Sequence, residues 1–206
     1  MISLAHGARY RVVFRRRREG KTDYRKRKAM ILSGVPRLVV RPSLKHIIVQ
    51  IVKAEPEGDK TSVFVRSSEL RRFGWEAPCG NVPSAYLTGL LAGLKAVSGG
   101  IKKAILDIGL HRASPGSRVF AALKGALDAG VEIPHDERVL PERSRIMGEH
   151  IASYGRRLSE ERPDLYKKLF SKYLERGIEP KDLTDHFTKV KEKMITSFEE
   201  SGKLNG

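Results

Sequence analysis

The stretch that decides the fold covers residues 37–67 and reads RLVVRPSLKHIIVQIVKAEPEGDKTSVFVRS. It holds three runs rich in β-branched and aromatic residues, at residues 37–41, 45–53 and 61–67, and such runs are typical of β-strands. A proline–serine pair separates the first two runs, and a Glu-Pro-Glu-Gly-Asp turn separates the second from the third. Because both connections are short, the three strands are expected to form an antiparallel meander.

Helical and strand patterns alternate from this stretch toward the C-terminus. A helix is predicted between an N-cap at Asn81 and a stop at Gly99, a strand over residues 104–108, a second helix over 117–129 and a last strand over 131–133. The order β-β-β-α-β-α-β places the chain in the α/β (α+β) class, with a mixed sheet covered by helices. The first helix carries apolar residues at helical spacing: Leu87, Leu90, Leu91 and Leu94.

The first predicted helix also has two glycines on one face, where no side chain projects. Gly89 and Gly93 lie one turn apart and therefore share that face. Another element can approach the helix closely there, and we expect that element to be the sheet.

From residue 141 onward the sequence is helical and balanced in charge. One amphipathic helix is expected to end at Gly177 and another to begin near Pro180. Because a helix with one apolar stripe is not stable alone, both are expected to pack on the α/β domain, on each other or on a partner. Their stripes contain Leu165, Leu169, Phe170, Tyr173 and Leu174 in the first helix, and Leu183, Phe187, Val190, Met194 and Phe198 in the second.

The net charge of +16 is distributed unevenly. Residues 1–45 carry 14 Lys or Arg against 2 acidic residues, which gives this segment +12. Its densest runs are the arginines at 15–18 and the RKRK segment at 25–28. Such an arm is either a solvated or localisation segment, or it contacts the phosphates of a polyanion, which the planar guanidinium suits well. We therefore divide the chain into a basic extended arm at 1–34, an α/β core at 35–140 and a helical extension at 141–206.

Aromatic residues are interleaved with the charges of the arm: Tyr10, Phe14 and Tyr24. Aromatic rings beside arginines can stack on unpaired bases. They can equally anchor the arm on its own domain, so this pattern leaves both interpretations open.

Motifs for catalysis are weak in this sequence. Residues 20–22 (GKT) resemble the end of a phosphate-binding loop, but the glycine that this motif requires five residues earlier is Arg15. The element order is also typical of RNase H-type nucleases, whose two-metal chemistry needs several converging carboxylates. Asp107 is the one acid in the central predicted strands, and we expect it to cap a turn or pair with a basic neighbour. The histidines and Cys79 lack zinc spacing, so no catalytic residue, metal or cofactor is predicted.

The sequence favours a cytosolic protein without a membrane partner. Its single cysteine allows no internal disulfide, and no N-terminal stretch resembles a signal peptide. The longest apolar segment, residues 47–52, is far too short to span a bilayer. The basic arm is compatible with binding to anionic lipid, but it lacks the apolar helix face of interfacial anchors.

Several segments, taken in order, are similar to one family: RRREGKTDYRKR at 16–27, PRLVVR at 36–41, AYLTGLL at 85–91, AILDIGL at 104–110 and FAALKGALDAG at 120–130. This family is the large-subunit ribosomal protein L-eighteen in its archaeal form, akin to eukaryotic L-five. The resemblance runs from about Tyr10 to at least Ile151. Bacterial relatives are shorter and lack the C-terminal helices, which favours an archaeal source.

The resemblance implies a non-catalytic protein of the cytoplasmic ribosome that binds 5S ribosomal RNA and attaches it to the large-subunit rRNA in the central protuberance, beside neighbouring ribosomal proteins. The asparagine common after the Arg-x-Ser turn is Leu44 here, which puts a polar contact at that position in doubt. The alternative function is a metal-dependent RNase H-like nuclease. The RNA-binding residues that the resemblance implies are Arg15, Arg16, Arg17, Arg18, Lys21, Thr22, Tyr24, Arg25, Arg27 and Lys28 in the arm, and Arg37, Arg41, Ser43, Lys45, His46 and Gln50 on the sheet.

Overall fold

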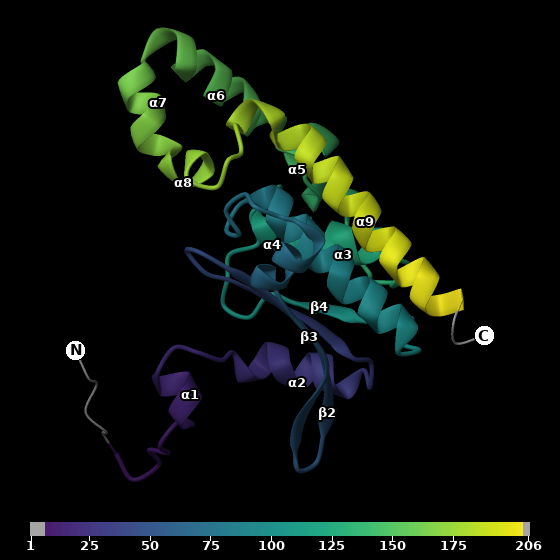
Figure 1. The fold of residues 1–206 in the computed structure, drawn as a ribbon. Helices are drawn as coiled ribbons and strands as arrows, with labels where there is room; N and C mark the ends of the chain where they lie inside the picture. Colours follow the sequence, from purple (N-terminus) through teal and green to yellow (C-terminus); the bar gives the residue numbers. More distant parts are fainter. Residues whose placement is uncertain (1–6, 204–206) are drawn as a thin grey trace.

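The computed structural model describes residues 7–203, with side chains described through residue 200 (Figure 1). Its sheet has four strands in the order β3-β2-β1-β4. The strands are β1 (Arg37–Pro42), β2 (Ile47–Glu55), β3 (Gly58–Arg66) and β4 (Ile105–Asp107). β1 pairs antiparallel with β2 and β2 with β3, whereas β1 pairs parallel with β4. The expected meander and the mixed sheet are therefore confirmed.

The last predicted strand, residues 131–133, is wrong. In the described chain this segment makes an isolated parallel bridge between Lys103 and Glu132. Val131 and Ile133 are buried, so their hydrophobic pattern reflects packing into the core rather than a strand. Pro134 follows directly, and because proline has no backbone N–H, it cannot extend the ladder beyond this bridge.

Two helices, α3 (Val82–Ser98) and α4 (Arg118–Asp128), cover one face of the sheet (Figure 1). The predicted cap of α3 is confirmed, because the Asn81 side chain accepts a hydrogen bond from the Ser84 N–H at 2.9 Å. Alternating strand residues point into this helical layer and form the main core: Leu38, Val40, Ile47, Val49, Ile51, Val63 and Val65.

The close approach expected at Gly89 is made to α4 and not to the sheet. A Cβ on Gly89 would overlap the carbonyl oxygen of Ala122, and a Cβ on Gly125 would overlap that of Tyr86. Each helix thus presents a glycine to the backbone of the other. The expectation was wrong because the sequence did not show that a glycine of the second helix would face Gly89.

The C-terminal part is helical, as expected. Its elements are α5 (Arg143–Met147), α6 (Glu149–Glu161), α7 (Pro163–Leu169), α8 (Ser171–Leu174) and α9 (Leu183–Lys203). Short 3-10 helices occur at η1 (Ser67–Phe73), η2 (Glu137–Val139) and η3 (Pro180–Asp182). Figure 1 shows α9 lying along α3, and the buried stripe of α9 includes Phe187, whose ring meets Tyr86 with centroids 5.6 Å apart.

The first of the two predicted C-terminal helices is divided at Phe170. One helix was expected through this residue, but α7 ends before it and α8 begins after it. The Phe170 ring is buried among Tyr154, Tyr166 and Tyr173, with centroid distances of 5.4–6.3 Å. The chain bends there so that this aromatic cluster closes against α6.

The arm lies across the face of the sheet opposite α3 and α4 (Figure 1). It holds a helical turn, α1 (Arg15–Arg18), and the predicted helix α2 (Tyr24–Leu32). The Asp23 carboxylate caps α2 by accepting hydrogen bonds from the N–H groups of Arg25 and Lys26. The arm is therefore less extended than expected, although neither helix has a fully buried side chain.

Candidate nucleic-acid interface

A groove of ≈ 660 Å³ separates the arm from the outer face of the sheet, the face that carries Arg37, Val39 and Arg41 of β1 and Gln50 and Val52 of β2. Cationic side chains line this groove from the arm and from β1: Arg16, Lys21, Lys26, Arg27, Arg37 and Arg41. His111 lines it from the loop after β4. Three carboxylates also line it: Asp23, Asp59 and Asp107. The way these acids are paired decides which cations remain available to a partner.

Asp59 and Asp107 neutralise the deepest cation of the groove. Arg37 is 4% exposed, and its Nη1 lies 2.8 Å from Asp107 Oδ2 while its Nη2 lies 2.7 Å from Asp59 Oδ2. Asp59 Oδ2 also pairs with Arg27 of α2 at 3.0 Å. This network joins α2, β3, β1 and the end of β4, so Arg37 holds the arm to the body and is not presented to a partner.

Asp107 has both of the roles expected for it. Besides its ion pair with Arg37, its Oδ1 accepts a hydrogen bond from the Gly109 N–H at 2.9 Å, which closes the turn after β4. Because a guanidinium occupies the space between Asp107 and Asp59, the two carboxylates face a fixed positive charge. A divalent metal would be repelled from that position.

Contacts within the arm orient some of its predicted RNA-binding residues. Arg16 Nε donates a hydrogen bond to the Thr22 hydroxyl at 2.8 Å. The rings of Phe14 and Tyr24 meet with centroids 4.9 Å apart, so in this structure the two aromatics pack on each other. The effect of these contacts is to fold residues 14–24 back on themselves.

The remaining arm cations are free. Glu19 pairs with Lys21 at 2.9 Å and, at the longer distance of 3.8 Å, with Arg15. The exposed arm cations that have no carboxylate partner among the described residues are Arg9, Arg11, Arg16, Arg17, Arg18, Arg25, Lys26 and Lys28. Adjacent unpaired cations repel each other, and a polyanion relieves that repulsion.

The turn between β1 and β2 is held rigidly. The Ser43 hydroxyl donates to the His46 carbonyl at 2.7 Å and accepts from the His46 N–H at 3.0 Å. Arg118 of α4 fastens this turn to the next loop by donating to the carbonyls of Ser43 and Gly80 at 2.7 and 3.0 Å. Ser43 is thus used within the turn, whereas Lys45 at its tip is exposed.

His46 lies among cations. Partial desolvation lowers the pKa of His46, and the positive charges of Arg66, Arg71 and Lys45 lower it further. Its Nδ1 lies 3.3 Å from the Ser67 hydroxyl. The three cations around His46 form a positive surface that suits a polyanion.

On the outer face, Arg41 lines the groove beside the arm, whereas Gln50 is not part of the groove lining. Arg41 is exposed, and Gln50 is half-buried between Val39 and the exposed ring of Phe64 in the strand register. The predicted residues therefore differ in what their side chains contact. Arg37, Thr22 and Ser43 make internal contacts, while most arginines and lysines point outward.

Sequence reasoning missed cations that lie outside the arm. Arg66, Arg71 and Arg176 come from β3, η1 and the loop after α8, and each is exposed. No motif marks them, because they approach one another only in the fold. For the same reason, the sequence could not predict that Arg66 and Arg71 lower the pKa of His46.

Within residues 7–203, no group of three or more His, Cys, Asp or Glu side chains is arranged to hold a metal ion. In the same part of the chain, every helix is too short or too polar to span a bilayer.

Comparisons with known proteins match this chain over most of its length. A family model described as "Ribosomal large subunit proteins 60S L5, and 50S L18" matches residues 8–100 and 97–136. The large ribosomal subunit protein uL18 of the archaeon Caldivirga maquilingensis is 52% identical over 199 residues, which cover 96% of this chain and 96% of that protein.

Proposed function

Because this chain belongs to the family of large-subunit ribosomal proteins that the two matches define, we propose that it binds 5S ribosomal RNA and attaches it to the large-subunit rRNA in the central protuberance. Membership makes the chain a structural constituent of the large ribosomal subunit in the cytoplasm, and not an enzyme. The nuclease alternative is thereby excluded. The identity of the RNA and the residues that touch it are our proposal.

The observation that carries the proposal is the unpaired positive charge of the arm. Residues 1–45 hold +12 of the +16 net charge, and Arg17, Arg18, Arg25 and Lys28 have no carboxylate partner among the described residues. Phosphates can neutralise these cations with release of counterions, which supplies affinity and makes it dependent on salt. Structured RNA is recognised through its backbone and shape, which an outward-facing arginine cluster can follow.

The sixteen predicted residues then divide into three roles. Direct phosphate contacts are assigned to the exposed cations of the arm and to Arg41 and Lys45. Gln50, Tyr24 and His46 contribute polar or stacking contacts at the edge of the surface. The residues that we assign to positioning are Arg16, Thr22, Arg27, Arg37 and Ser43, because each is held by a partner within the protein.

The experiment is a titration of the purified full chain with 5S rRNA and with an unrelated structured RNA of equal length, over a series of salt concentrations. Selective binding to 5S rRNA is expected. Replacing residues 15–18 with alanine should weaken binding and lower the slope of log K against log salt by about 2 to 3, since three of these arginines are assigned phosphate contacts and each contact contributes roughly 0.7–0.9. Equal binding to both RNAs, or an unchanged slope, would refute the proposal.

A further inference from the structure

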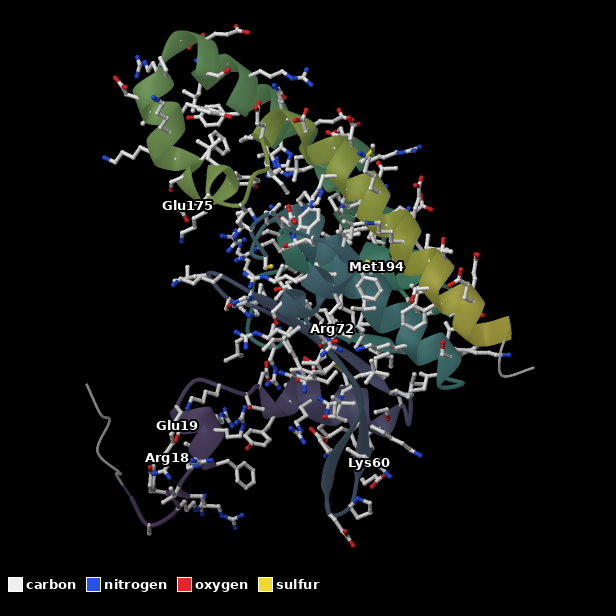
Figure 2. The ribbon with its side chains drawn as sticks, in the orientation of Figure 1. Arg18, Glu19, Lys60, Arg72, Glu175 and Met194 are labelled. Carbon is white, nitrogen blue, oxygen red and sulfur yellow. The ribbon has the colours of Figure 1, made fainter. Side chains whose placement is uncertain are left out.

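A second group of cations extends from the β1–β2 turn to the C-terminal helices. We call it the cationic track and define it as Lys45, Arg66, Arg71 and Arg176. Lys45, Arg66 and Arg71 all lie close enough to His46 to lower its pKa, and Arg71 and Arg176 both lie close enough to Cys79 to oppose the rise in its pKa. Successive members of the track are therefore within electrostatic range of a shared neighbour. Figure 2 shows nitrogen-tipped side chains gathered between α8, next to the labelled Glu175, and the arm, marked by Arg18.

The track ends in a hollow of ≈ 430 Å³ between two arginines. Arg71 of η1 and Arg176 after α8 line it, together with Gly74, Trp75 and Glu76. The Lys193 ammonium of α9 lies close to Gly74, within 3.8 Å of where its Cβ would be. Two cations from separate elements, Arg71 and Arg176, therefore line one depression, and Lys193 lies beside its Gly74.

The charge of this hollow is not balanced from within. Among the described residues, no member of the track forms an ion pair with a carboxylate. Glu76 lines the hollow, but its carboxylate makes no ion pair with Arg71 or Arg176, and its charge acts on His186. Bringing these cations together costs repulsion, which a bound anion would offset.

Arg176 is also held ready for an anion. Its Nη1 donates to the carbonyls of Glu76 and Ala77 at 3.1 and 3.4 Å, which fixes the guanidinium at the rim. Its Nε and Nη2 donors have no partner among the described residues, and a guanidinium offers such donors to phosphate oxygens in a planar fork. Because Arg176 belongs to the helical extension, this part of the chain gains a role that the arm does not have.

We propose that the hollow between Arg71 and Arg176 binds a phosphate of the RNA that the arm binds, so that the RNA backbone continues along the cationic track. This inference rests on the proposed function and deepens it. It assigns the helical extension a direct contact with RNA, made by Arg176.

The test compares the full chain with the variant R71Q/R176Q in 5S rRNA titrations between 50 and 200 mM salt. Loss of one phosphate contact should lower the salt slope by about 1, so the ratio of variant to wild-type Kd should be about fourfold larger at 50 mM than at 200 mM. The charge-retaining variant R71K/R176K should keep the wild-type slope. A matched control, K102Q/K103Q, removes the same charge at the other end of the sheet and should leave the slope unchanged.

Thermal melts of all variants separate binding from folding, since R176Q also removes two hydrogen bonds. A correctly folded R71Q/R176Q protein with the wild-type slope would overturn the inference and would leave the hollow to an acidic segment of a neighbouring protein. Identical behaviour of the lysine and glutamine pairs would also overturn it, because the effect would then not be one of charge. If the arm variant alone flattens the slope, the proposed function stands and only the role of the track fails.

Discussion

Replacing Arg37 with methionine distinguishes a scaffold residue from an RNA contact. Methionine keeps much of the volume of arginine but leaves Asp107, whose side chain is 11% exposed, without its cationic partner. Removing one partner of a buried ion pair costs about 3–5 kcal/mol. Asp107 retains the Gly109 N–H and Asp59 retains Arg27, so we expect the low end, about 3 kcal/mol.

The measurement is the free energy of unfolding from urea titration, together with the melting temperature. For a chain of this length, a loss of about 3 kcal/mol lowers the melting temperature by roughly 6–12 °C. The double variant R37M/D107L should recover most of the loss, because an apolar pair of similar volume is often as stable as a buried ion pair. If R37M melted within about 2 °C of the wild type while losing salt-dependent affinity for 5S rRNA, Arg37 would be a contact and the reasoning would fail.

Two further predictions concern the helical layer and the docking of α9. Gly89→Ala should destabilise the protein by about 3 kcal/mol in urea titration, because the added Cβ overlaps the α4 backbone, whereas Gly99→Ala, where the Cβ has space at 3.4 Å, should change stability by less than about 1 kcal/mol. His186 accepts a hydrogen bond from the Glu76 N–H at 3.2 Å, and burial lowers the pKa of His186 below 6.5. The unfolded state therefore takes up the proton first, and stability should fall as pH drops below 6.5 until the folded-state pKa is reached. Melts from pH 7.5 to 5 should show a smaller decline in H186Q than in the wild type, and equal declines would contradict this role.

The sequence predicted the elements whose patterns are local. The meander, the cap at Asn81 and helix α2 follow from alternation, capping and turn residues within a few positions of one another. The strand at 131–133 was wrong because its buried residues fit a core position as well as a strand, and Pro134 decides between the two. The prediction of one continuous helix through Phe170 was wrong, because the chain bends there to form an aromatic cluster built partly from α6.

The site was predictable only where its residues are adjacent in the chain. Consecutive arginines mark the arm in the sequence, and their charge predicted that the arm would be exposed. The burial of Arg37 did not, because its partners Asp59 and Asp107 lie 22 and 70 residues away. Arg71 and Arg176 meet across an even longer separation, and no local pattern marks them. The division into three parts at residues 34 and 140 stays a prediction.

The placement of acids explains how a chain of this charge can hold a folded core. Two of the three carboxylates in the groove, Asp59 and Asp107, pair with Arg37 and Arg27, the cations closest to the sheet, where unpaired charge would be most costly. The cations farther from the core, such as Arg17 and Arg18, remain unpaired in water, where their repulsion is weak and screened. The same distribution that keeps the free protein stable leaves its outermost charges available to RNA. It follows that adding acids near Arg17 and Arg18 would weaken RNA binding with little gain in stability, since exposed ion pairs contribute less than about 1 kcal/mol.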